Sequence, residues 1–153
     1  MGFKPVSNVQ KIIAIAADHA GFELKSRLVE YLKSEGYEVL DLGTHSTERV
    51  DYPDYGHAIA EAIAAGKAGC GIAICGSGIG ISIAANRNPM IRAALCHDVT
   101  SARLARAHND ANVLAMGARL TGPAVALECI DVFLKTPFEG GRHADRVKKL
   151  GNC

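Results

Sequence analysis

A glycine-rich turn after a cysteine carries the strongest chemical signal in this 153-residue sequence. The segment Cys75–Gly80 reads CGSGIG, and Gly76, Gly78 and Gly80 allow the backbone to turn tightly. Successive N–H groups in such a turn, at the start of a helix, form a cradle for an anion. A tight turn that binds nothing has the same composition, so the turn alone leaves both interpretations open.

The spacing of these glycines argues against two common nucleotide-binding motifs. The last glycine of a dinucleotide fingerprint would fall at Ile81, and the Gly-Lys-Ser/Thr of a P-loop does not follow. The turn therefore favours a phosphate or an enolate-like oxyanion over NAD or ATP. At the start of a helix, Cys75 would be favoured as a thiolate, which acts as a nucleophile or general base. An ordinary cysteine at the end of a strand is the alternative.

Two histidines have neighbours that suit proton transfer or anion binding. Asp18 and His19 directly follow an apolar run, and a carboxylate beside an imidazole orients it or keeps it charged. Capping of the next helix explains Asp18 equally well. His108 and Asn109 end a helical stretch in which Leu104 and His108 share one face, so a buried structural histidine is the alternative there.

Arginines near the end of the chain suit a phosphate dianion. Arg142 and Arg146 are four residues apart, so on a helix their guanidinium groups point the same way. Converging guanidinium groups bind phosphate through charge-assisted hydrogen bonds. Arg119 follows an apolar run and is a candidate to join them. A solvated helix face is the alternative for the pair.

Hydrophobic periodicity predicts the elements that must position these residues. Short apolar runs predict strands at Lys11–Ala17, Tyr37–Leu42, Cys70–Cys75, Arg92–Cys96 and Val113–Met116. Helical spacing predicts helices between Gly21 and Gly36, and at Tyr55–Lys67, Ile79–Arg87, Asp98–Ala107, Pro123–Leu134 and Arg142–Leu150. In the first helix the leucines share a stripe, and Lys25 is expected on another face. The alternation predicts an α/β fold, a three-layer αβα Rossmann-like sandwich with a five-stranded parallel sheet.

Composition excludes several classes of protein. The net charge of +1 gives no general attraction to nucleic acid or to an anionic membrane. The 19 residues of Ala68–Asn86 carry no charge, but five glycines interrupt them, so a strand, turn and helix are expected rather than a membrane span. We expect residues 1–10 to be a loose extension without signal-peptide features, and residues 11–153 to form a single domain.

The five cysteines are widely spread, and they form neither a CxxC pair nor a zinc-ligand spacing with histidine. We therefore expect no metal site, no disulfide framework and a reducing, cytoplasmic setting. Cys70, Cys96, Cys129 and Cys153 lack the surroundings of Cys75 and are expected to be inert. No role is expected for His45, His57, His97 or His143.

Five segments together resemble the type B ribose-5-phosphate isomerases, a family that also contains isomerases of allose and galactose 6-phosphates. They occur in order from about Lys11 to Leu150, and together they are more specific than any one motif. The segments read AADHAGFELK, DYPDYG, ICGSGIGISIAANR, HNDANVLAMGAR and FEGGRHADRV. The resemblance implies interconversion of D-ribose 5-phosphate and D-ribulose 5-phosphate, a step of the pentose phosphate pathway, through a cis-enediolate and without metal or coenzyme.

The resemblance also implies roles for the matching residues. Cys75 matches the general base that moves a proton between C2 and C1, and Ser77 with the amides of the glycine turn matches the anion hole for the enediolate. His108, with Asn109 beside it, matches the group that opens the furanose ring and comes from the neighbouring subunit. Substrate contacts are implied at Asp18, His19, Tyr52, Gly76, Gly78, Gly80, Arg119, Arg142 and Arg146, with His19 and the arginines at the phosphate.

A shared site implies a homodimer, or a tetramer built from such dimers. One branch of the family carries a glutamate where this chain has Ile81, so the chain resembles the cysteine-type branch. Some galactose-6-phosphate isomerase subunits lack the cysteine, which argues against that assignment. An isomerase of allose 6-phosphate or another hexose phosphate, and a non-catalytic module that binds a phosphorylated metabolite, are the alternatives.

Overall fold

Strands and helices alternate through the computed structural model, which describes residues 11–151. The strands are β1 (Ile12–Ala17), β2 (Glu38–Asp41), β3 (Cys70–Cys75), β4 (Ala93–Leu95) and β5 (Val113–Gly117). The helices are α1 (Phe22–Ser34), α2 (Tyr52–Ala64), α3 (Ile79–Asn86), α4 (Val99–Asn109), α5 (Pro123–Lys135) and α6 (Arg142–Leu150). The extension expected at residues 1–10 lies outside the described residues.

The strands form one parallel sheet in the order β2-β1-β3-β5-β4, which confirms the predicted five-stranded sheet. From β1 the chain crosses to β2 on one side and later to β3 on the other, so the direction of winding changes between β1 and β3. Parallel sheets bind ligands in the crevice at such a switch point, beyond the carboxyl ends of the strands. Asp18 and Cys75 lie at these ends of β1 and β3.

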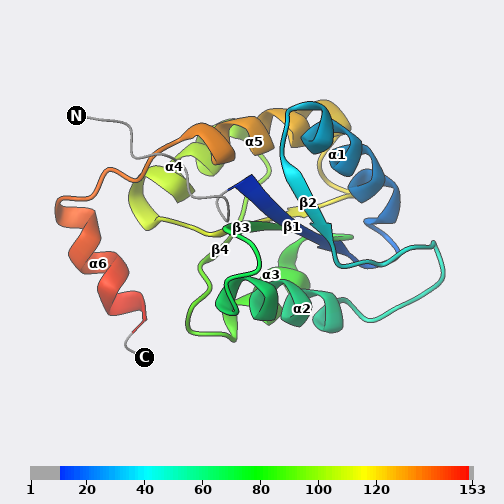
Figure 1. Ribbon diagram of the computed structural model, residues 1–153, viewed down its shortest axis with the longest axis horizontal. Helices are drawn as coiled ribbons and strands as arrows, with labels where there is room; N and C mark the ends of the chain where they lie inside the picture. Colours follow the sequence, from blue (N-terminus) through cyan, green and yellow to red (C-terminus); the bar gives the residue numbers. More distant parts are fainter. Residues whose placement is uncertain (1–10, 152–153) are drawn as a thin grey trace.

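Helices cover both faces of the sheet, which confirms the three-layer αβα arrangement (Figure 1). On one face α1, α4 and α5 contribute leucines, alanines and Cys129 to the larger core, and on the other face α2 and α3 pack over the sheet. Side chains of the central strands β1, β3 and β5 are almost fully buried. Their alanines and glycines let the helices approach closely, as with Gly71, where a Cβ would lie 2.9 Å from Ile59.

The helix α6 stands apart from the three layers, beside the end of α4 (Figure 1). Its buried residue is His143, whereas Arg142, Arg146 and Leu150 are exposed. A helix packs a stripe of side chains against a neighbour when it is stabilised by its own domain. The single buried position therefore leaves most of the surface of α6 outside the core of this chain.

Several boundaries differ from the prediction by a few residues. Helix α2 begins at Tyr52 rather than Tyr55, because Pro53 fits the first turn of a helix and Asp51 is already extended. Asp98 caps α4 as predicted, with its Oδ1 accepting a hydrogen bond from Ser101 N–H at 2.7 Å.

Among residues 11–151, no helix combines the length and apolar character needed to cross a membrane.

Candidate active site

The glycine turn places the Cys75 thiol against the N-terminus of α3. Cys75 is 4% exposed, and its Sγ accepts a hydrogen bond from the Gly78 N–H at 3.1 Å. Gly78 has a φ of +79°, and a Cβ there would lie 2.5 Å from Leu95 Cδ1 and 2.7 Å from the Met116 backbone carbon. Only glycine satisfies both demands, so the sequence of the turn fixes how the sulfur meets the helix. A donated N–H and a helix N-terminus both stabilise negative charge on sulfur.

The neighbouring strand ends beside this sulfur with Asp18 and His19. Asp18 is buried, and its Oδ1 accepts hydrogen bonds from the N–H groups of Ala20 at 3.0 Å and Gly21 at 3.2 Å. The Asp18 carboxylate therefore shapes the turn between β1 and α1. His19 Nδ1 accepts a hydrogen bond from the Val50 N–H at 3.2 Å, which ties this turn to the loop before α2.

Tyr52 and Arg119 complete this edge of the sheet from two further elements. A Cβ at Gly80 would lie 2.5 Å from the Tyr52 ring, and a Cβ at Gly76 would lie 3.1 Å from Arg119 Nη1. The tyrosine and the arginine therefore both lie against the glycine turn. We call this group the carboxyl-edge cluster, and it comprises Asp18, His19, Tyr52, Cys75, Gly76, Ser77, Gly78, Gly80 and Arg119.

His108 and Asn109 lie at the other end of the sheet. They end α4, which runs back from the carboxyl ends of the strands, and β5 starts shortly afterwards at Val113. Val113 pairs with Gly71, four residues before Cys75 on β3. At a rise of ~3.3 Å per residue, the start of β5 lies about 13 Å from the level of Cys75 along the strands. Within one chain His108 is therefore beyond hydrogen-bonding reach of a group held at Cys75.

Arg142 and Arg146 lie with His108 rather than with Cys75. They belong to α6, and Figure 1 shows this helix beside α4, at the end of the molecule opposite the loop between β2 and α2. The Glu139 N–H donates to the Ala107 carbonyl at 3.0 Å, which fixes the start of α6 to the end of α4. We call His108, Asn109, Arg142 and Arg146 the amino-edge cluster. Within one chain, the predicted site residues thus form two clusters at opposite edges of the sheet.

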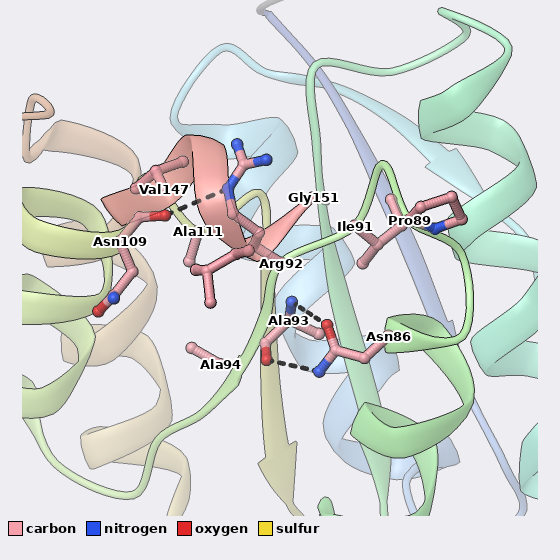
Figure 2. A pocket seen from close by; sticks show the side chains of 11 residues that line it. Asn86, Pro89, Ile91, Arg92, Ala93, Ala94, Asn109, Ala111, Val147 and Gly151 are labelled. Atoms are coloured by element: carbon pink, nitrogen blue, oxygen red, sulfur yellow. Dashed lines mark hydrogen bonds between the residues drawn. The ribbon is translucent and has the colours of Figure 1, made fainter. Parts of the chain in front are cut away.

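A clamp of charged side chains holds the end of α4. Arg92 Nε donates to the carbonyls of Asn109 at 3.1 Å and Asp110 at 3.0 Å, and Figure 2 shows the first of these bonds. Arg106 Nη1 donates to Asp110 Oδ1 at 2.9 Å and to the Ala111 carbonyl at 2.6 Å. Asp110 has a φ of +46°, a conformation that non-glycine residues rarely adopt. The clamp therefore fixes the turn that presents Asn109.

Two residues that lie against His108, namely Glu139 and His143, were not predicted from the sequence as its neighbours. The His143 ring stacks on the His108 ring, with centroids 4.3 Å apart and an interplanar angle of 11°. Glu139 Oε2 lies 3.7 Å from His108 Nε2 and 3.4 Å from His143 Nε2. Burial, together with the nearby His108 and Arg142, lowers the pKa of His143 below its usual value. The spacing of Glu139 and His143, four residues apart, is the one sequence signal for this group.

Lys25, which the sequence places on a face of α1 other than the leucine stripe, is buried. Its side chain is 2% exposed, and its Nζ donates to both carboxylate oxygens of Asp41, each at 2.7 Å. Burial raises the pKa of Asp41, but the hydrogen bonds from Lys25 and the Gly43 N–H outweigh it and leave this pKa below its usual value. The sequence gives no sign of this pair, because Lys25 lies on α1 and Asp41 lies on β2.

The remaining cysteines within the described residues are poor nucleophiles. Burial raises the pKa of the Cys70 thiol to about 12 and that of Cys129 to about 11. Burial also raises the pKa of Cys96. These thiols stay protonated near neutral pH, which agrees with the expectation that they are inert. Cys153 lies outside the described residues.

Known proteins resemble this chain in both sequence and fold. The model of the ribose/galactose isomerase family matches residues 13–150. Ribose-5-phosphate isomerase B of Escherichia coli (strain K12) is 49% identical over 140 residues, which are 92% of this chain and 94% of that protein. D-erythrulose-4-phosphate isomerase of Pectobacterium atrosepticum is 46% identical over 140 residues, 91% of this chain and 92% of that protein.

A solved structure gives the same answer for the fold. The structure of ribose-5-phosphate isomerase B from Clostridium thermocellum is 53% identical in sequence and superposes with a TM-score of 0.91. The match covers 92% of this chain and 95% of that one. Sequence and structure agree over almost the same extent, and the chain belongs to the ribose/galactose isomerase family of sugar-phosphate isomerases.

Proposed function

We propose that the protein interconverts D-ribose 5-phosphate and D-ribulose 5-phosphate, with Cys75 as the base. The observation that carries the proposal is the Cys75 sulfur at the N-terminus of α3, where it accepts the Gly78 N–H. A thiolate held there can remove a proton beside a carbonyl group. The names of the relatives in Escherichia coli and Clostridium thermocellum support this substrate.

The reaction moves one proton between two carbons and one between two oxygens, and it needs no oxidant. The Cys75 thiolate takes the proton from C2, and the electrons of that C–H bond form the C1–C2 double bond of an enediolate, with the charge on O1. The O2 hydroxyl proton passes to O1, which moves the negative charge to O2. The thiol then returns its proton to C1 as the C2 carbonyl forms. We assign stabilisation of this oxyanion to the Ser77 hydroxyl and the N–H groups in the first turn of α3, where the Ile79 N–H now donates to Ser77 Oγ at 3.2 Å.

The substrate contacts divide between two copies of the chain. We assign the sugar hydroxyl contact to Asp18 and a place in the substrate loop to Tyr52. The phosphate meets His19 and Arg119 of one copy and Arg142 and Arg146 of the other. Arginines bind phosphate through paired, charge-assisted hydrogen bonds, which suits an exposed helix that reaches into a partner. His108 of the second copy opens the furanose ring, with Asn109 beside it on the substrate.

The distance between the two clusters supports a homodimer as the active form. The carboxyl-edge and amino-edge clusters cannot meet in one chain, because about 13 Å of strand separates their levels. Two copies related by a two-fold axis would place each amino-edge cluster at the other copy's carboxyl edge, which yields two equivalent sites. The exposed surface of α6 is available for that contact. We propose this homodimer, alone or within a tetramer, as the active form, in a reducing cytoplasm that suits a base made of a free thiol.

The decisive experiment is a direct assay for ketose formation from ribose 5-phosphate. Allose 6-phosphate is assayed in parallel, because the resemblance extends to isomerases of longer sugars. D-erythrulose 4-phosphate is the third substrate, because a relative bears that name. We expect the highest kcat/KM with ribose 5-phosphate. A higher value with either other sugar reassigns the substrate, and binding without turnover of any sugar supports a non-catalytic module.

The phosphate assignment has its own test. Arg142→Ala and Arg146→Ala should each raise the KM for ribose 5-phosphate ~10-fold or more with a smaller change in kcat, because they remove charge-assisted bonds to the phosphate. Lys148→Ala, also exposed on α6, is the control and should leave the KM unchanged. An unchanged KM in both arginine variants would place the phosphate elsewhere.

A further inference from the structure

The side chains around His108 form a set of metal ligands that proton transfer does not require. His108 Nε2 and His143 Nε2 both face one oxygen, Oε2 of Glu139, at 3.7 Å and 3.4 Å. The three candidate ligand atoms all lie within 4.8 Å of one another. We propose that His108, Glu139 and His143 bind Zn²⁺, and that bound zinc inhibits the enzyme. The binding stands on this geometry, and the inhibition rests on the function proposed above.

The distances suit a tetrahedral ion. Bonds of ~2.0–2.2 Å from zinc to imidazole nitrogen and carboxylate oxygen place neighbouring ligand atoms about 3.4 Å apart in a tetrahedron. The two histidine–glutamate distances agree with this value to within about 0.3 Å. Two imidazoles and one carboxylate leave the fourth position open to water or to a sugar oxygen. Imidazole ligands favour zinc and other transition metals over Mg²⁺ or Ca²⁺.

The stacked rings must separate slightly for both to bind. Imidazole lone pairs lie in the plane of the ring, and two rings that are parallel to within 11° and stacked 4.3 Å apart cannot both aim their lone pairs at one point. The His143 side chain is 10% exposed and is held between α6 and the body of the chain, whereas that of His108 is 38% exposed and has room to tilt. Glu139, with a side chain that is 57% exposed, can follow the ion. Binding therefore requires a rotation of His108 and leaves the backbone unchanged.

Positive charge near these ligands favours weak, reversible binding of zinc over a permanently bound structural ion. The guanidinium groups of Arg142 and Arg146 lie near His143 and repel a zinc ion, and the Glu139 carboxylate offsets part of that repulsion. A zinc ion held at His108 Nε2 occupies a lone pair of the imidazole to which we assign ring opening. The ion would therefore stop the first step of the reaction while the Cys75 thiol in the same site stays intact.

Calorimetric titration with ZnCl₂ tests the binding without any need for turnover. The protein carries Cys75→Ala, because a thiolate also binds zinc. One ion per chain is expected. A further Glu139→Gln or His143→Gln change should weaken binding by more than the roughly 10–100-fold that loss of an outer-shell partner costs. His57→Gln, an exposed histidine on α2, is the matched control and should bind like the parent. Equal binding by all these proteins would overturn the site.

Inhibition is measured in proteins that retain Cys75, each relative to its own turnover in the presence of a chelator. Zinc should inhibit the parent reversibly, and Glu139→Gln should raise the inhibitory concentration by the factor that calorimetry gives. Zinc that binds at these residues without lowering turnover would overturn the inhibitory role. A metal-free protein that isomerises no sugar phosphate would count against the proposed function, and the calorimetry would still decide the site.

Discussion

Mixed dimers give a quantitative test of the separation between the two clusters. One chain carries Cys75→Ala and the other carries His108→Ala. Each homodimer should lose at least the ~10²-fold that removal of a general acid or base costs. In a mixed dimer one site combines the intact Cys75 of one chain with the intact His108 of the other, and the second site carries both changes. The measured activity therefore reports which chain supplies each residue.

The size of the recovery follows from the geometry. After random exchange of equal amounts, half of the dimers are mixed and half of their sites are intact, so activity should reach about one quarter of the wild-type value. The same fraction holds in a tetramer, provided that each site draws on two chains. Exchange is verified by native mass spectrometry with chains of different mass, and ketose formation is measured on the same samples. A mixture with verified mixed dimers that is no more active than the mean of its two components would refute the shared site.

Three other predictions concern the base, the turn and the buried ion pair. Cys75→Ala should lower kcat ~10²–10⁴-fold with an unchanged circular dichroism spectrum, and near-normal turnover would exclude the thiol as base. Gly78→Ala and Gly36→Ala both place alanine at positive φ, at a cost of about 1–2 kcal/mol, but only Gly78→Ala also meets neighbouring atoms at 2.5 Å, so it should lose about 1–3 kcal/mol more in urea denaturation. Equal losses of unfolding free energy in the two variants would show that the turn relaxes to accommodate the added methyl group. Asp41→Asn leaves Lys25 buried without its carboxylate and should cost about 3 kcal/mol at pH 7. The folded state lowers the pKa of Asp41, so the ion pair stabilises the protein above the unfolded pKa of 3.8, and this stabilisation is lost as the pH falls through the lower folded pKa. The difference in unfolding free energy between wild type and Asp41→Asn should therefore shrink below pH 3.8. A difference that does not change with pH would contradict the pairing.

Local patterns were sufficient to predict the fold. The apolar run that became β3 and the leucine stripe of α1 each bury one continuous surface, and such surfaces have few ways to pack. The alternation of strands and helices then imposed the parallel sheet and its two covering layers. The carboxyl-edge cluster followed in turn, because parallel strands end at one edge. Asp18, which follows β1, and Cys75, which ends β3, lie at the same edge for that reason.

The amino-edge cluster shows where sequence reasoning stops. Nothing in a periodic pattern says that Glu139 and His143 would approach His108, because the contact depends on how α6 turns after the loop that precedes it. The buried pair of Lys25 and Asp41 has the same character, since each residue looks solvent-exposed until the other is seen. Contacts between side chains on different elements depend on tertiary geometry, whereas helices and strands depend on their own residues.

The edge of the sheet at β4 has a consequence for how copies of the chain can meet. The Asn86 side chain donates to the Ala93 carbonyl at 3.0 Å and accepts from the Ala93 N–H at 2.7 Å, and both bonds are visible in Figure 2 beside a groove of about 420 Å³. The amide thus imitates a neighbouring strand and occupies the N–H and C=O groups of Ala93, which an invading strand would otherwise use. At Ala93, therefore, the β4 edge of the sheet has no unpaired backbone groups to offer to a strand of another copy.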